Sequence, residues 1–163
     1  PKPETIGIVY EQINEHEYVE PNRCHASSLF KLMFQAIDQR EYHLYVSLHQ
    51  TEFVGSTRDC MVILPILYDE QPEWIQQTER RVAEKVIQRW REIGGKPVEK
   101  IEPLGYKGTQ AEYLRRAFRP LAMRMPGLTS EVRNNSLLCP PSKQRGLCEA
   151  VIWAAIEWAM ESL

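Results

Sequence analysis

Four residues in three separate parts of the chain have side chains suited to hydrolytic chemistry. Asn22 and Arg23 are adjacent, His49 follows an apolar stretch, and Glu131 comes just before the last predicted helix. A guanidinium can hold a carboxylate by two parallel hydrogen bonds. An imidazole can bind a metal ion, and a carboxylate can take a proton from water. The set therefore favours zinc-dependent hydrolysis.

Each of these residues also has a simpler structural interpretation. His49 can be a hydrogen-bonded histidine at the end of a strand, and Glu131 a solvated carboxylate or a partner of Arg133. Arg23 can be an exposed side chain in a polar loop. No single residue decides between the two interpretations, so the chemical one rests on their occurrence together.

Length, charge and hydropathy exclude several classes of protein. The chain has 163 residues and a mass of 19.0 kDa, which is typical of one domain with a substantial core. Its net charge is −2 and its pI about 6.1, with acidic and basic residues well mixed, so nucleic acid is not an expected partner. No apolar run reaches the roughly 18 to 20 residues that span a bilayer. We expect a soluble protein that does not bind membranes.

The cysteines and the N-terminal residues indicate the cellular compartment of the protein. None of the four cysteines forms a Cys-x-x-Cys pair. Cys139 and Cys148 bracket a proline-containing loop and could form a disulfide in an exported protein, but buried free thiols are favoured. The chain opens with Pro1 and lacks a secretory-type N-terminus, so we expect a cytoplasmic protein that is processed, truncated or cut from something longer.

Hydrophobic periodicities of 2 and 3.6 residues divide the chain into strands and helices. Residues 11–21 and 134–145 are predicted to be loops. The predicted strands are 5–10, 42–48, 60–67, which Pro65 ends or places at an edge, and 128–132. The predicted helices are 28–40, 73–93, 110–118 and 146–163. Ser27 or Ser28 caps the first, Gly94-Gly95 stops the second, and Pro120 shortens or kinks the third. The fourth is apolar almost all round and is expected to be buried.

Strands interleaved with helices predict an α/β fold, with a mostly parallel or mixed sheet flanked by helices and residues 1–163 as a single domain. Ligands of such sheets bind beyond the carboxyl ends of the strands. His49 and Glu131 both fall at predicted strand ends, although 82 positions separate them. We therefore expect these two side chains to meet.

The order of these motifs resembles the zinc carboxypeptidase superfamily, which includes the M14 peptidases and the succinylglutamate desuccinylase and aspartoacylase deacylases. The resemblance runs from about Pro21 to the end of the chain. It implies that Asn22 and Arg23 bind the substrate carboxylate, that His49 is a zinc ligand, and that Glu131 is the general base. The bound zinc would polarise the scissile carbonyl and activate water.

The sequence departs from that family at the first zinc-binding motif. The family's His-x-x-Glu should precede Asn22, but the upstream histidine, His16, has Val19 where glutamate is required. His49 and Glu52 fit the spacing, but no histidine follows them to complete the site. The resemblance therefore implies zinc with two ligands missing from this chain, as in an N-terminally truncated, C-terminal part of a catalytic domain.

Three functional hypotheses remain open. The first is a zinc-dependent hydrolase that cleaves an amide bond of a carboxylate-bearing peptide or small molecule, as a carboxypeptidase or an N-deacylase. The second is a non-catalytic relative that binds a carboxylate or peptide without holding zinc. The third is one half of a larger assembled domain, which would associate with another chain through a truncated sheet edge.

Overall fold

The computed structural model describes residues 10–21, 24–134 and 136–162, and the predicted strand 5–10 lies almost entirely outside these ranges. The strands are β1 (Glu11–Gln12), β2 (Tyr18–Val19), β3 (Tyr45–Thr51), β4 (Cys60–Leu64), β5 (Glu102–Pro103) and β6 (Gly127–Arg133). The helices are α1 (Ser28–Gln39), the short 3₁₀ turn η1 (Tyr68–Glu70), α2 (Glu73–Glu92), α3 (Gly108–Ala122) and α4 (Pro141–Ser162).

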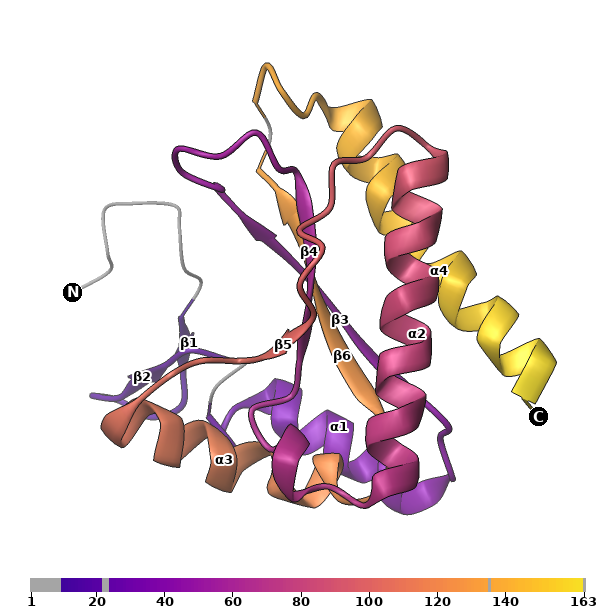
Figure 1. The fold of residues 1–163 in the computed structure, drawn as a ribbon. Helices are drawn as coiled ribbons and strands as arrows, with labels where there is room; N and C mark the ends of the chain where they lie inside the picture. Colours follow the sequence, from indigo (N-terminus) through magenta and orange to yellow (C-terminus); the bar gives the residue numbers. More distant parts are fainter. Residues whose placement is uncertain (1–9, 22–23, 135, 163) are drawn as a thin grey trace.

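The centre of the molecule is a four-stranded mixed sheet in the order β3-β6-β4-β5 (Figure 1). β3 runs parallel to β6, β4 runs antiparallel to β6, and β5 is parallel to β4. The register of the first pair aligns Tyr45 with Gly127 and His49 with Glu131. The predicted α/β class and mixed sheet are confirmed, and β3 forms one edge of the described sheet.

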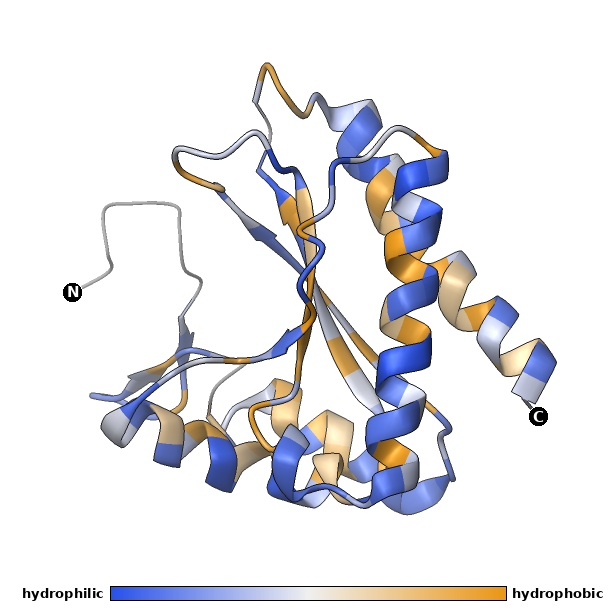
Figure 2. Cartoon of the chain, in the orientation of Figure 1, coloured by the Kyte–Doolittle hydropathy of each residue, from blue (hydrophilic) through white to orange (hydrophobic). Residues whose placement is uncertain are grey.

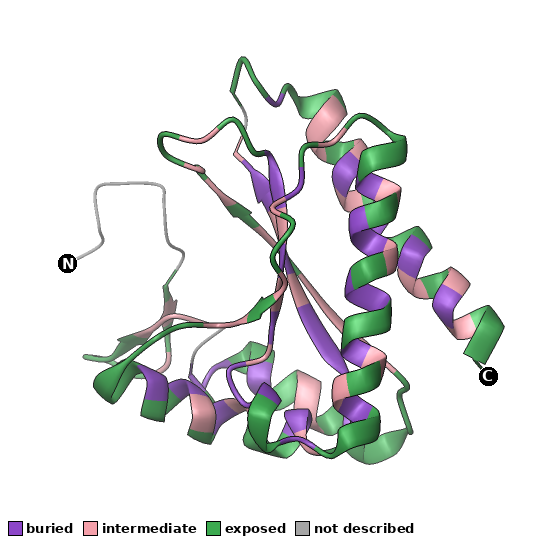
Figure 3. Ribbon diagram, viewed as in Figure 1, coloured by how far each residue is buried: buried purple, intermediate pink, exposed green. Residues whose placement is uncertain are grey.

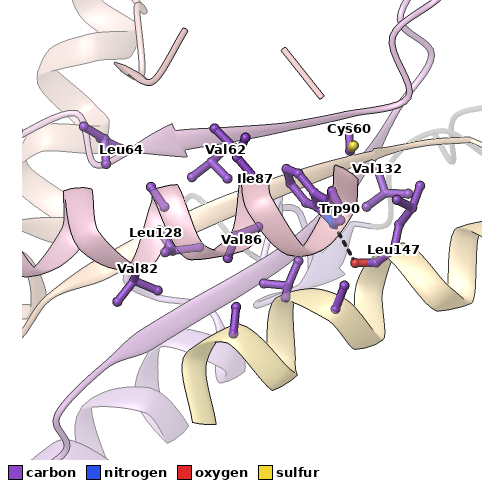
Figure 4. Packing of buried hydrophobic residues seen from close by; sticks show 14 of the residues in the cluster. Cys60, Val62, Leu64, Val82, Val86, Ile87, Trp90, Leu128, Val132 and Leu147 are labelled. Carbon is purple, nitrogen blue, oxygen red and sulfur yellow. Dashed lines mark hydrogen bonds between the residues drawn. The ribbon is translucent and has the colours of Figure 1, made fainter. Parts of the chain in front are cut away.

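One face of the sheet is covered by α2 and α4, which pack side by side (Figure 1). Alternate residues of β4 and β6 point into this layer, and α2 places its apolar stripe against them. Figure 4 shows Trp90 in the middle of this core, where its Nε1–H donates to the Leu147 carbonyl over 2.8 Å. Figure 3 shows buried positions in both strands and at intervals along α2, and these residues form one hydrophobic cluster with those of α4.

The opposite face of the sheet has less cover. α1 and α3 meet below it, at the end where β3 and β6 begin (Figure 1). Their contact is hydrophobic (Figure 2) and includes an edge-to-face pair of Phe30 and Phe118 rings, 5.0 Å between centroids. Tyr45, Ser47 and His49 on this face are only partly buried.

The first helix is held in place by its N-terminus. The Ser27 hydroxyl accepts a hydrogen bond from the Phe30 amide, as an N-cap should, and donates one to the Pro21 carbonyl. The Glu11 carboxylate accepts from both the amide and the hydroxyl of Ser28. Glu11 belongs to the β1–β2 hairpin, a short paired element within the predicted loop 11–21, so the hairpin is tied to the start of α1.

Two helix boundaries differ from the sequence-based expectation. α4 begins at Pro141, inside the predicted loop, because proline is well tolerated in the first turn of a helix. α3 continues through Pro120 to Ala122, so the proline does not end it. Pro65 does end β4, as predicted. None of the described helices has the length and apolar character needed to cross a membrane.

The last helix is also less buried than its composition suggested. Leu147, Val151 and Ala154 face the core, whereas Ile152 and Trp153 lie on the solvent side, with Trp153 59% exposed. The expectation of a buried helix therefore holds for one face of α4 and is wrong for the other. A helix that is apolar all round does not by itself reveal which of its faces finds a partner.

Candidate functional site

His49 and Glu131 lie next to each other on neighbouring strands. They are aligned in the parallel register of β3 and β6, and both line the same cavity. Side chains of aligned residues point to the same face, and adjacent strands are about 4.8 Å apart. Each residue lies inside its strand, two positions before the end rather than at the end. The structure nevertheless places the two residues side by side at one cavity, and their chemical roles stay predictions.

The His49 imidazole is oriented by a residue of its own strand. Its Nε2 lies 2.8 Å from the Ser47 hydroxyl, two residues earlier on the same face. The alternative interpretation of a hydrogen-bonded strand histidine is therefore correct in part. Such a bond also fixes the ring orientation, which is a common arrangement for a histidine that binds metal through its other nitrogen.

Glu131 is a partly buried carboxylate with little stabilisation of its charge. Its Oε2 is buried and has no hydrogen-bond partner among the described residues. Burial raises the pKa of Glu131 above its usual value of 4.5. A carboxylate with a raised pKa holds a proton more readily, which suits a group that must accept one during a reaction.

Arg133 does not pair with Glu131, although that was one alternative from the sequence. Its guanidinium is buried and donates to backbone carbonyls of the loop between β3 and β4, including those of Glu52 (2.8 Å) and Ser56 (2.6 Å). The guanidinium also lies 5.4 Å from the centre of the Phe53 ring. Arg133 therefore holds the loop that follows β3, and Glu131 keeps its unpartnered oxygen.

A cavity of about 530 Å³ opens along the less covered face of the sheet. Its polar lining comes from His49 and Glu131, with Ser47 and Thr129 before them on the same strands. Its apolar lining comes largely from α1, α3 and β4. A concave, mostly apolar site with a few convergent polar groups is the usual form of a small-molecule or peptide site.

The other predicted site residues and the metal need separate treatment. Asn22 and Arg23 lie outside the described residues, so their place relative to the cavity stays a prediction. In the described ranges, no three His, Cys, Asp or Glu side chains come together in a way that could hold a metal ion. The cysteines in these ranges are free thiols, including Cys139 and Cys148.

Ser47 and Thr129 were not singled out from the sequence. The two-residue alternation that places Tyr45 and Ser47 on one side of β3 also places His49 there, and the same rule joins Thr129 to Glu131. The signal was therefore present in the strand periodicity. It required the register between β3 and β6, which no local pattern provides.

Comparison with known proteins identifies a fold. No family model matches the chain, and no curated protein matches it. Among solved structures, the chain resembles a metallo-carboxypeptidase from Burkholderia cenocepacia, with a TM-score of 0.56 and 15% sequence identity. The match covers 89% of this chain but only 39% of that protein. The fold thus resembles that of part of a metallo-carboxypeptidase.

Proposed function

We propose that this chain carries the general base and one zinc ligand of a hydrolase that cleaves an amide bond of a carboxylate-bearing substrate. The observation that carries the proposal is the alignment of His49 with Glu131 at the polar end of one cavity. The fold likeness to a metallo-carboxypeptidase supports the same assignment. Both a carboxypeptidase and an N-deacylase remain within this proposal.

The described residues do not fit a catalytic zinc site by themselves. Such a site uses three protein ligands and one open position, and His49 is the single ligand proposed here. The hydrolase proposal therefore requires two further ligands from outside the described residues. We assign the metal-binding role to the His49 imidazole, whose ring is oriented by the hydrogen bond between Nε2 and the Ser47 hydroxyl.

Glu131 has the proton-transfer role in this proposal. Its carboxylate takes a proton from the attacking water and passes it to the leaving amine, so that it ends the reaction in its starting state. Removal of water from the Glu131 oxygen favours the protonated intermediate form of the side chain. Asn22 and Arg23 are proposed to hold the substrate carboxylate, with the Arg23 guanidinium forming the fork.

The proposal is tested on the protein at its full natural length, loaded with zinc. Release of amino acid from N-acetyl amino acids and from C-terminally unblocked peptides is measured with Glu131→Gln and His49→Ala. Glu131→Gln should lower kcat by about 10² to 10⁴-fold while zinc stays bound, and His49→Ala should lose zinc. Glu52→Gln, in the loop after β3, is the control and should retain activity. Unchanged turnover in Glu131→Gln would refute the role of the base.

A second function is favoured by one observation. No group of three metal-binding side chains is present in the described ranges, as expected for a relative that binds a carboxylate or a peptide without catalysis. The two functions differ in metal content. About one zinc per full-length protein supports hydrolysis, whereas no zinc after reconstitution supports binding alone.

A further inference from the structure

The cavity changes character along the sheet. His49 and Glu131 lie four residues beyond Tyr45 and Gly127 in the shared register, which is a distance of about 13 Å at the usual rise of a strand. The polar groups are thus at one end. The other end lies against α1 and α3, where the lining is apolar.

The apolar end is a built surface rather than a loose gap. Its wall includes the edge-to-face pair of Phe30 and Phe118, and Leu121 and Met125 are themselves buried beside them. These residues belong to one hydrophobic cluster with Tyr45 and Met33, or contact it. Their side chains are therefore held in place before any ligand arrives, which lowers the ordering cost of binding.

The part of the cavity between its two ends has no charged residue among the described lining residues. Ile63 of β4 is aligned with Thr129 of β6, and both line the cavity between Glu131 and the apolar end. Of the described lining residues, none is Lys, Arg or Asp, and Glu131 is the one carboxylate. A charged group placed at the apolar end would lose its water without gaining a partner, which costs several kcal/mol.

We propose that this cavity takes a bulky, uncharged apolar side group of the substrate, aromatic or long aliphatic, in the space between Phe118, Met33 and Ile63. The side group would extend from the scissile bond at Glu131 toward the helices. This inference rests on the proposed function for the position of the reacting bond. It does not need hydrolysis in order to be tested.

The test is a binding measurement on the metal-free 163-residue chain. N-acetyl-L-phenylalanine and N-acetyl-L-glutamate share an α-carboxylate and differ in the side group. Each is titrated while backbone amide shifts are followed by NMR. The phenylalanine derivative should bind at least about tenfold more tightly, with shifts at Tyr45, Ile63 and Thr129. Equal binding of the two compounds, or shifts elsewhere, would overturn the proposal.

Two neighbouring residues of α1 provide matched variants. Met33 lines the cavity, whereas Leu32 is 64% exposed and does not. Met33→Lys should weaken binding of N-acetyl-L-phenylalanine by about tenfold or more, because the new charge enters an apolar space. Leu32→Lys should change it less than about twofold. The wild-type preference provides an independent test if Met33→Lys does not fold.

Failure of this inference and failure of the proposed function give different results. If N-acetyl-L-phenylalanine binds as expected but the zinc-loaded full-length protein shows no turnover, the apolar pocket is supported and the proposed hydrolysis is refuted. If turnover depends on Glu131 but the phenylalanine and glutamate derivatives bind equally well, hydrolysis is supported and the assignment of an apolar side group is refuted.

Discussion

The two faces of the central sheet are built from the same strands but have opposite uses. On the face toward α2 and α4, Val62, Leu128 and Val132 are sealed in the main core. On the other face, His49 of β3 and Glu131 of β6 line a cavity. Because strand residues alternate, Leu128 and Val132 of β6 pack in the core, whereas Thr129 and Glu131 between them line the cavity.

Two carboxylates, Glu79 fully buried and Glu131 partly buried, illustrate the difference between these faces. Glu79 of α2 accepts hydrogen bonds at Oε1 from the Gly127 amide (2.8 Å) and from the Gln71 side chain (2.9 Å). Glu131 has no partner among the described residues for its Oε2. Oε2 of Glu79 also has no partner among the described residues. The difference is that the covered side gives its carboxylate two hydrogen bonds at Oε1, which fix the start of β6.

The largest expected effect concerns the core of the covered face. Trp90→Ala should lower the free energy of unfolding by about 3 to 5 kcal/mol, because it removes a fully buried side chain and the hydrogen bond to Leu147. Trp153→Ala, on the exposed side of α4, should change it by less than about 0.5 kcal/mol. Urea unfolding measures both. Similar losses of unfolding free energy in the two variants would mean that the core of the covered face is not the main source of stability.

The next effect is a dependence of stability on pH. Burial raises the pKa of Glu79 to about 7, partly offset by the hydrogen bonds from Gly127 and Gln71. Because the folded pKa lies above the unfolded value, stability from Glu79 is fully present below about pH 4.5 and is lost as pH rises through about 7. Wild-type protein should lose on the order of 3 kcal/mol across this range.

Substitution separates this effect from the general titration of the protein. Glu79→Gln should flatten the stability profile between pH 4.5 and 8, as measured by urea unfolding at each pH. Glu84→Gln, at an exposed position of the same helix, should leave the wild-type profile unchanged. A slope that survives in Glu79→Gln would assign the pH dependence to another group.

The next prediction concerns the loop between β3 and β4, which Arg133 holds in place. Arg133→Ala should cost about 2 kcal/mol, because carbonyls of the loop 52–58 lose their donor. Amide hydrogen exchange in that loop should increase more than in α2. Arg116→Ala, exposed on α3, is the matched control. If exchange rises equally throughout the molecule, Arg133 stabilises the whole fold rather than this loop.

The smallest effect concerns the exposed edge of β3. Leu48 is 45% exposed on the edge strand, and we expect the chain to associate through this edge as its concentration rises. Leu48→Lys should weaken the association while changing the free energy of unfolding by less than about 0.5 kcal/mol. Sedimentation velocity over a range of concentrations measures it. Equal association of the wild-type protein and Leu48→Lys would mean that another surface mediates the association.

The sequence predicted the elements that carry strong periodicity. The two-residue alternation in 42–48 predicted a strand, which the structure places three residues later as Tyr45–Thr51. The expected proximity of His49 and Glu131 followed from their place in neighbouring strands of one sheet. The start of α4 was missed because Pro140-Pro141 resembles a loop, although a proline also suits the first turn of a helix.

Other features depend on contacts that no local pattern contains. The exposed side of α4 at Trp153 results from the absence of a described neighbour there, and the cavity results from the way α1 and α3 meet at Phe30 and Phe118. The register of β3 against β6 likewise joins residues far apart in the sequence. The roles of Asn22 and Arg23 remain predictions from their residue types.

The most direct test of the central claim is the titration of the Glu131 carboxyl group itself. Carbon-13 NMR of the glutamate side chains, with the Glu131 signal identified by its loss in Glu131→Gln, gives the midpoint in the folded protein. Burial beside His49 without a partner at Oε2 predicts a midpoint above the ordinary value of 4.5. A midpoint at or below that value would contradict the account, because Glu131 would then be an ordinary solvated carboxylate.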